Sequence, residues 1–348
     1  MSALALYNLT MTSEVVGLAL AFCFNCVIML LLVHRSSPSL GSYKYLMMMY
    51  AMVELAYSLI GFSASSGAHS TDSAYVVFRI YNGPNRTIAP FFLLQYCGSI
   101  FVLLLVLAVH FIYRYFAVCN SEKMYLFQGH RVVLWVLSAI LVGLLCPVLK
   151  YIFLGEHTSA TEHLRKEMKR AYNLSMESIV YNGAFFRMCD TKGGCETPLA
   201  VWVTVSIIVV SLIGCFVLMT SFGVLTYSTL KKSSGAISAK TLQMQKQLLV
   251  ALLIQGGIPI VFMYIPITVL WVSPAFGYGF GAYGNITMIC VAIYPPLDQL
   301  ATMYIIKDFR LAIKKVLGFQ EEVSGNNSSQ IGIVRTDHSL VPSTSKHF

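Results

Sequence analysis

Residues 87–113 form an uncharged stretch that constrains this chain more than any other feature. The stretch holds no Asp, Glu, Lys or Arg, and His110 is its only histidine. As an α-helix its 27 residues extend for about 40 Å, enough to cross the hydrocarbon of a bilayer. Residues 101–107 are apolar on every side of such a helix, so no face is left for water. The aromatic and basic residues 110–115 then indicate the cytoplasmic interface of a membrane span.

A buried helix of a large soluble protein is the alternative interpretation, and composition opposes it. Hydrophobic residues make up 57% of the chain and charged residues only 11%. The net charge of +9 comes from basic residues that flank apolar segments, never more than two in a row, which is typical of topology signals and not of a nucleic-acid site. We expect no secretory signal, because residues 1–13 lack Lys and Arg and the apolar run 15–33 is longer than a signal's core.

Seven apolar segments are long enough to span a bilayer, so the sequence predicts an all-α membrane protein built as a seven-helix bundle. We expect an extracellular terminus at residues 1–14, a transmembrane domain at 15–317, and a disordered cytoplasmic tail rich in Asn, Ser, Gly and Thr at 318–348. The predicted spans are 15–33, 45–63, 88–112, 132–149, a segment within 197–230, one beginning after residue 246, and 286–306.

The distribution of charge predicts that the amino terminus lies outside and the carboxyl terminus inside. With this orientation the cytoplasmic segments hold 13 basic residues and two nearby acids, whereas the outer segments hold nine basic and eight acidic residues. The Lys and Arg excess of short loops belongs on the cytoplasmic side. The glycosylation triplets at Asn8, Asn85 and Asn173 then all fall outside, although two triplets in the tail, at Asn326 and Asn327, show that such matches also occur by chance.

Residues 307–317 follow the last span and carry an amphipathic pattern. Phe309, Ile313 and the pair Val316 and Leu317 lie along one helical face, and basic residues occupy the rest. This pattern predicts a short eighth helix on an anionic inner leaflet, with membrane lipid as its partner; a juxtamembrane coil is the alternative.

Several short motifs recur in a particular order. Residues 40–47 open the second span, 110–117 close the third, 245–248 lead into the sixth, and 294–298 lie in the seventh. In order and spacing they resemble the Str class of nematode serpentine chemoreceptors, the group that includes the diacetyl odorant receptor, over about residues 25–317. The resemblance implies a G-protein-coupled odorant receptor for chemotaxis in the plasma membrane of a sensory cilium. The partners it implies are a small-molecule odorant, a heterotrimeric G protein and a ciliary-trafficking accessory protein.

Arg114 lies between Tyr113 and Tyr115 at the inner end of the third span. It resembles the arginine with which rhodopsin-like receptors engage the G protein. No acid precedes it, however, and residues 227–246 offer no acid for an inter-helix lock. The alternative is a positively charged topology anchor, and at the cytosolic rim we expect Arg114 to contribute little to packing.

Two further sets of residues are predicted to act in switching. Pro259 and Pro266 lie seven residues apart in the sixth span and permit a kink or hinge there. Asn25, Glu54 and Asp298 fall at nearly equal depth in the first, second and seventh spans. Taking the two carboxyls as the only acids inside spans, we expect the three side chains to meet and share a proton or a sodium ion. The alternative is that each acid is protonated and bonded to backbone without a switching role.

The predicted ligand pocket lies among the outer halves of the third, fifth, sixth and seventh spans. Its residues carry no formal charge, so we expect a small neutral ligand held by aromatic contacts and one or two hydrogen bonds. For Trp271 an interfacial anchor is equally open. The candidate pocket residues are Phe92, Gln95, Tyr96 and Ser99 on the third span and Tyr264, Thr268 and Trp271 on the sixth.

Cys189 and Cys195 lie together in a polar outer loop, and we expect them to form a disulfide, with Cys97 as the alternative partner.

We find no His pair for a metal, no nucleophile elbow and no lysine in the seventh span for a retinal Schiff base, so we expect neither an enzyme nor a cofactor. A seven-span ligand-gated channel or transporter that uses intramembrane carboxylates remains the competing class.

Overall fold

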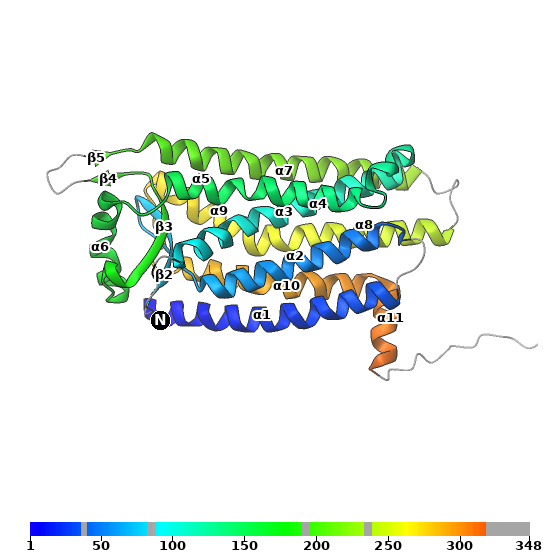
Figure 1. Cartoon of the computed structure of the whole chain (residues 1–348), viewed down its shortest axis with the longest axis horizontal. Helices are drawn as coiled ribbons and strands as arrows, with labels where there is room; N and C mark the ends of the chain where they lie inside the picture. The colour runs from blue at the N-terminus through cyan, green and yellow to red at the C-terminus, as the bar shows by residue number, and fades with distance from the viewer. Residues whose placement is uncertain (36–39, 82–85, 87, 190–194, 233–238, 318–348) are drawn as a thin grey trace, which may run out of the picture.

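The computed structural model describes the chain except residues 36–39, 82–85, 87, 190–194, 233–238 and 318–348. The predicted tail and Asn85 therefore lie outside the described residues. Within the described part, seven helices are long and apolar enough to cross a membrane, and Figure 1 shows them side by side along the long axis of the molecule. The predicted seven-helix bundle is confirmed. The seven spans are α1 (Ala3–His34), α2 (Tyr43–Ala64), α3 (Ala89–Cys119), α4 with α5 (Arg131–Phe153), α7 (Leu199–Lys232), α8 to η5 (Ala239–Phe276) and α10 (Gly284–Ile305).

Helix α3 is the centre of the bundle, because 67% of its most apolar stretch is buried, against 22% for α7. The outer surface of the bundle is apolar, with Phe22, Leu141 and Val210 all more than half exposed, as lipid-facing side chains are. Close packing against α3 depends on small residues. A Cβ on Gly143 would lie 2.4 Å from Cγ2 of Val102, so only glycine lets α4 approach α3 this closely.

Helix α1 begins at Ala3, well before the predicted start at residue 15. Ser2 caps it, with its Oγ accepting a hydrogen bond from the Ala5 N–H at 3.2 Å. Leu6, Tyr7 and Thr10 are buried, and the Thr10 hydroxyl donates to the Asn285 carbonyl of α10 at 3.3 Å. The segment predicted as a separate terminus is thus a continuous extension of the first span, since tertiary contacts bury one of its faces.

Prolines shape two of the spans. Helix α4 (Arg131–Gly143) ends four residues before Pro147, and α5 (Leu145–Phe153) continues the span at a break. A proline ring collides with the carbonyl four residues earlier, which accounts for the break. In the sixth span, α8 (Ala239–Pro259) gives way to a π-helical turn at Ile260–Tyr264, followed by α9 (Ile265–Val272) and a 3₁₀ turn at Ser273–Phe276.

A small antiparallel sheet covers one end of the bundle, which the all-helical prediction did not include. Strands β1 (Gly67–Ser70) and β2 (Ala74–Ile80) come from the α2–α3 connection, and β3 (Ile179–Phe185) comes from the loop before α7. Val77 pairs with Asn182 in the β2–β3 register. Helix α6 (Thr158–Tyr172) packs on the sheet at the same end as the amino terminus (Figure 1). We refer to β1–β3 and α6 as the cap.

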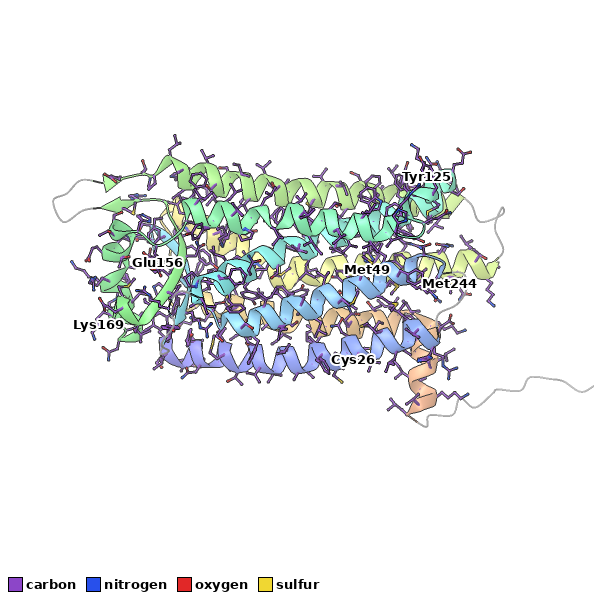
Figure 2. The ribbon with its side chains drawn as sticks, in the orientation of Figure 1. Cys26, Met49, Tyr125, Glu156, Lys169 and Met244 are labelled. Carbon is purple, nitrogen blue, oxygen red and sulfur yellow. The ribbon has the colours of Figure 1, made fainter. Side chains whose placement is uncertain are left out.

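The two ends of the molecule differ in structure. Glu156 and Lys169 lie at the capped end, and Tyr125, which follows α3 in a 3₁₀ segment (Ser121–Phe127), lies at the other end (Figure 2). There, helix α11 (Lys307–Val316) turns away from the bundle axis (Figure 1). Phe309 of α11 is buried while Val316 is 84% exposed. A helix is present where the sequence predicts one, and its position on a membrane surface stays a prediction.

Candidate functional site

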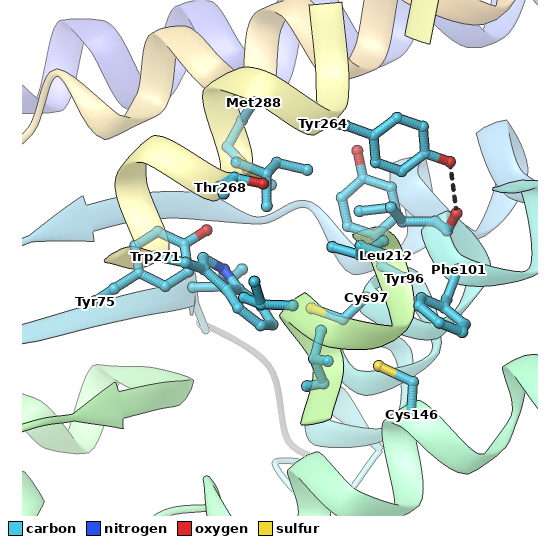
Figure 3. Close-up of a pocket in the computed structure, with 15 residues that line it drawn as sticks. Tyr75, Tyr96, Cys97, Phe101, Cys146, Leu212, Tyr264, Thr268, Trp271 and Met288 are labelled. Atoms are coloured by element: carbon cyan, nitrogen blue, oxygen red, sulfur yellow. Dashed lines mark hydrogen bonds between the residues drawn. The ribbon is translucent and has the colours of Figure 1, made fainter. Parts of the chain in front are cut away.

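An internal cavity lies between α3, α7 and α9, directly beneath strand β2. About 50 Å³ of it is open to the centre of a water-sized molecule. Figure 3 shows its side chains converging from separate segments of the chain. The lining residues are Tyr75 and Val77 of β2; Tyr96, Cys97, Ile100 and Phe101 of α3; Cys146 of α5; Ile208, Val209 and Leu212 of α7; Tyr264, Ile267, Thr268 and Trp271 of the sixth span; and Met288 of α10.

The cavity wall is apolar apart from a few hydroxyl, thiol and indole groups. Two tyrosine hydroxyls are already bonded: that of Tyr264 donates to the Ile100 carbonyl at 3.3 Å (Figure 3), and that of Tyr96 donates to Oε1 of Glu14 at 3.0 Å. The Thr268 hydroxyl has no hydrogen-bond partner among the described residues, so it is available to a ligand. None of the lining side chains carries a formal charge.

Four of the predicted pocket residues line this cavity: Tyr96, Tyr264, Thr268 and Trp271. The other three, Phe92, Gln95 and Ser99, are not among the lining residues. Ser99 bonds its own helix, donating to the Tyr96 carbonyl at 2.7 Å. On α3 the face toward the cavity includes residues 97, 100 and 101, so it is turned by about 100°, one residue, from the predicted face.

Sequence reasoning did not include β2 or Lys150 in this region. Tyr75 and Val77 reach the cavity only because the cap folds over the bundle, a non-local event that leaves no periodic pattern in the sequence. Lys150 lies in the last turn of α5, and only 2% of it is exposed. Its Nζ lies 4.5 Å from the ring centroid of Trp271, a lining residue, so a charged group lies behind the cavity wall.

Glu14 forms a second polar site next to the cavity. It is 4% exposed, and its carboxyl accepts a hydrogen bond from Tyr96. The Tyr57 hydroxyl lies 3.4 Å from that of Tyr96, which extends the network to α2. A Cβ on Gly61 would come within 2.8 Å of the Tyr96 ring, so glycine makes room for this contact. The prediction that Glu54 and Asp298 are the only acids inside spans is therefore wrong, because α1 starts early enough to include Glu14.

Glu54 and Asp298 do lie together, fully buried deeper in the bundle. Gln299 donates to Glu54, and Nε2 of Gln255 donates to Oδ2 of Asp298 at 3.4 Å. The Tyr50 side chain lies close to both carboxyls, which are also close to each other. One oxygen of each carboxyl has no partner among the described residues. Two facing carboxyls with unused oxygens are a geometry that accepts a shared proton or a cation.

Asn25 is buried, yet no hydrogen bond in the described part of the chain joins it to the two acids that it was predicted to meet. Its Nδ2 donates to the Ala21 carbonyl of its own helix at 2.9 Å. The two glutamines, Gln255 and Gln299, bond the carboxyls instead. Gln299 directly follows Asp298, and Gln255 lies on the neighbouring α8, so only helix packing identifies them as partners.

Arg114 points into the bundle at the end opposite the cap. It is 2% exposed, and its guanidinium donates to the carbonyl oxygen of Gln245 at 3.1 Å and to Oε1 of the same residue at 2.5 Å. It also lies over the Tyr43 ring, 5.3 Å from the centroid. The expectation that Arg114 contributes little to packing is wrong. Gln245 takes the place of the missing acid, and the pair links α3 to α8.

The neighbours of Arg114 face different helices. Tyr113 is buried and packs on Tyr43 of α2, with ring centroids 5.1 Å apart. Tyr115 packs on Phe222 of α7 at 4.9 Å. The inner end of α3 is therefore held on several sides, and their part in G-protein coupling stays a prediction.

Pro259 and Pro266 flank the π-helical turn of the sixth span. Pro259 ends α8, and Pro266 lies in the first turn of α9. A π-helical turn is a local departure from regular helix geometry and is frequent at functional sites. Because Tyr264 and Thr268 of this region line the cavity, the irregular turn connects the cavity to the inner half of the helix.

The predicted modification sites lie at the capped end. Asn8 and Asn173 are both exposed, and Asn173 ends α6 in the left-handed region with φ of 57°. Cys189 and Cys195 are paired positions of the short β4–β5 ladder (Met188–Cys189 and Cys195–Glu196), although their side chains lie outside the described residues. Cys97, the alternative partner, is a free cysteine that lines the cavity.

Comparison with known proteins agrees with this architecture. The family model described as "Serpentine type 7TM GPCR chemoreceptor Str" matches residues 10–314. The serpentine receptor class r-10 of Caenorhabditis elegans is 29% identical over 345 residues, covering 95% of this chain and 96% of the relative. The G-protein coupled receptor str-33 of the same species is 25% identical over 300 residues, covering 84% and 86%. Squid rhodopsin shares the fold, with a TM-score of 0.62 at 10% identity, covering 92% of this chain and 87% of the other.

Proposed function

The chain belongs to the Str family of serpentine seven-transmembrane chemoreceptors, and from that premise we propose that it is an odorant receptor that serves chemotaxis. A multi-pass, G-protein-coupled receptor with a small-molecule ligand and a G-protein partner follows from the family itself. The finer proposal is that a small volatile with a mostly apolar body binds in the cavity beneath β2. We further propose the sensory cilium as its location, with a ciliary-trafficking protein as an accessory partner.

The cavity is the observation that carries this proposal. It is enclosed by helices and by the cap, its wall is largely apolar, and it offers the Thr268 hydroxyl as a free hydrogen-bonding group. A site of this kind favours small ligands held by aromatic contact and one or two hydrogen bonds. The wall includes Tyr264 of the π-helical turn and residues of α9 directly after it, so occupancy is able to bias the packing of that helix.

The opposite end of the bundle supports signalling to a G protein. The Arg114–Gln245 contact joins α3 and α8 there, and a surface groove beside α8 is lined by Leu242, Lys246 and Ile305. Arg114 is able to exchange its Gln245 partners for carbonyls of another protein when α8 moves. The paired buried carboxylates also fit a channel or transporter, but the family and the rhodopsin-like fold favour the receptor.

A ligand screen with a cytosolic calcium readout tests the proposal. Cells that express the full chain with a promiscuous G protein are exposed to a volatile panel, and Thr268→Val is compared at equal surface expression. We expect a response that Thr268→Val weakens about tenfold in EC50, since one buried hydrogen bond is lost. Thr220→Val on the exposed face of α7 is the matched control. An undiminished response in Thr268→Val removes the cavity from the proposal.

A further inference from the structure

Lys150 is a buried cation at the outer end of α5. A lysine at the end of a membrane helix ordinarily extends its ammonium to the headgroups and water. Here the neighbouring residues Tyr151 and Ile152 take the outward positions, being 69% and 61% exposed, while Lys150 itself is 2% exposed. The lysine therefore faces the bundle and not the lipid.

Within the described part of the chain, the ammonium of Lys150 has an aromatic neighbour and takes part in no ion pair. Its Nζ lies 4.5 Å from the Trp271 ring centroid. Four ion pairs occur among the described residues, and none includes Lys150. A buried ammonium without a counter-charge is costly, and a cation–π contact offsets only part of that cost. The arrangement thus leaves room for an anion.

The lysine is held directly beside the cavity. Cys146 lies one helical turn before Lys150 on the same face of α5 and lines the cavity, as Trp271 does on the opposite side. Asn182 of β3 anchors this helix end, because its Nδ2 donates to the Lys150 carbonyl at 3.1 Å and to the Leu154 carbonyl at 2.8 Å. The flexible four-carbon stem of lysine and its three donors allow the ammonium to reach past the indole.

We propose that Lys150 is the counter-charge for a short-chain carboxylate whose hydrocarbon chain occupies the cavity. The inference rests on the proposed function and names the ligand class of the same site. The sequence predicts a neutral ligand from pocket residues that do not include Lys150. The apolar wall accepts the hydrocarbon chain of the acid. The space open to the centre of a water-sized molecule is about 50 Å³, which holds roughly four water-sized groups and so fits an acid of three to six carbons.

The test compares pentanoate, pentan-1-ol and pentylamine at pH 7.4, where the acid is ionised. In the calcium assay we expect pentanoate to be about tenfold more potent than the alcohol, and the amine to be inactive. Lys150→Gln should raise the EC50 of pentanoate about tenfold or more and leave that of pentan-1-ol unchanged, while Lys150→Arg should retain the preference. Lys166→Gln, on the exposed face of α6, is the matched control.

A binding measurement separates this inference from the proposed function. Pentanoate should raise the unfolding temperature of purified full-length receptor by about 2–4 °C, and this shift should be absent in Lys150→Gln. Stabilisation without any calcium response would support the carboxylate site and contradict the odorant-receptor assignment. Equal potency of acid and alcohol with no effect of Lys150→Gln, or no stabilisation by pentanoate, would overturn the inference and leave the receptor assignment standing.

Discussion

Among the described residues, three carboxyl groups are buried in the bundle, and each has a different set of neighbours. Glu14 accepts a hydrogen bond from Tyr96, a cavity residue, whereas Glu54 and Asp298 face each other with Gln299 and Gln255 as donors. An ionised carboxylate in hydrocarbon costs several kcal/mol by roughly any scale, so such groups persist only with partners or protons. Unused oxygens on Glu54 and Asp298 indicate that this pair, and not Glu14, is the candidate ion or proton site.

We expect Glu54→Gln and Asp298→Asn to have non-additive effects on the ligand response. Groups that share one proton or one ion interact energetically, with a coupling free energy on the order of 1 kcal/mol or more. The measurement is a double-mutant cycle on EC50 at matched surface expression. Strictly additive effects would mean that each carboxyl acts alone, as in the alternative of separately protonated, backbone-bonded acids.

At the scale of elements, α3 is tied to its neighbours at both ends. At the inner end, Arg114 donates two hydrogen bonds to Gln245 of α8, and at the outer end the Tyr264 hydroxyl of the sixth span donates to Ile100. The π-helical turn at Ile260–Tyr264 ends at the second of these contacts. The sixth span is therefore held at two points with an irregular turn near one of them, which suits a helix that has two packing arrangements.

Breaking the inner contact should activate the receptor without ligand. Gln245→Ala removes the amide that Arg114 bonds, so we expect basal signalling to rise several-fold. Arg114→Ala should lose ligand-driven signalling and lower surface expression, because the guanidinium is buried. Both are measured as G-protein activation normalised to surface level, with Thr220→Val on the exposed face of α7 as control. An unchanged basal level in Gln245→Ala would show that the contact does not restrain α8.

The β4–β5 ladder brings Cys189 and Cys195 opposite each other. Paired residues of antiparallel strands have Cα atoms about 4.5–5.5 Å apart, which is within the range of a disulfide. We expect this bond to form in the oxidising exterior and to stabilise the loop by about 2 kcal/mol. Non-reducing peptide mapping of receptor from intact membranes is the measurement, and finding both thiols free would end the prediction.

At the scale of the whole molecule, the cap closes the bundle at one end, and the signalling contacts lie at the other. The cap is assembled from two distant segments of the chain, and β2 of this cap forms part of the cavity wall. Its core includes His69 of β1, which is 2% exposed and lies against the Tyr172 ring of α6. Conditions that loosen the cap should therefore change access to the cavity.

We expect the cap to loosen in acid because of His69. Burial, with Arg170 nearby, lowers the pKa of His69 from 6.5 to about 4, so the folded cap binds this proton less readily than the unfolded cap does. The stabilisation is complete above pH 6.5 and is lost as pH falls toward 4, by at most about 3 kcal/mol. Hydrogen exchange of peptides 67–80, corrected for the intrinsic pH dependence of the exchange rate, should show more frequent opening at pH 4.5 than at pH 7.0. This difference should vanish in His69→Gln. Equal pH dependence in both proteins would contradict the mechanism.

The sequence by itself determined the number of spans, the fold class and the family resemblance. Lipid requires each span to satisfy its own backbone, so hydropathy and loop charge record these features locally. Candidate site residues that are chosen by residue type and depth, such as Arg114, Glu54 and Asp298, are identifiable from the sequence for the same reason. The predicted cavity face of α3 differs from the observed face by only one residue. The sequence does not determine the rotation of this helix more finely, because the helix is apolar on every side.

Only the tertiary structure decided which side chains meet. Glu14 became a buried acid because contacts with the cap and α10 extend α1 toward its start, and Gln245 and Gln299 became partners because α8 and α10 pack where they do. The cap places Tyr75 in the cavity through pairing with β3, about a hundred residues later. In the sequence, Lys150 marks the end of the fourth predicted span. That its side chain faces into the bundle depends on the packing of α5. Such contacts are non-local, so no local pattern of the chain encodes them.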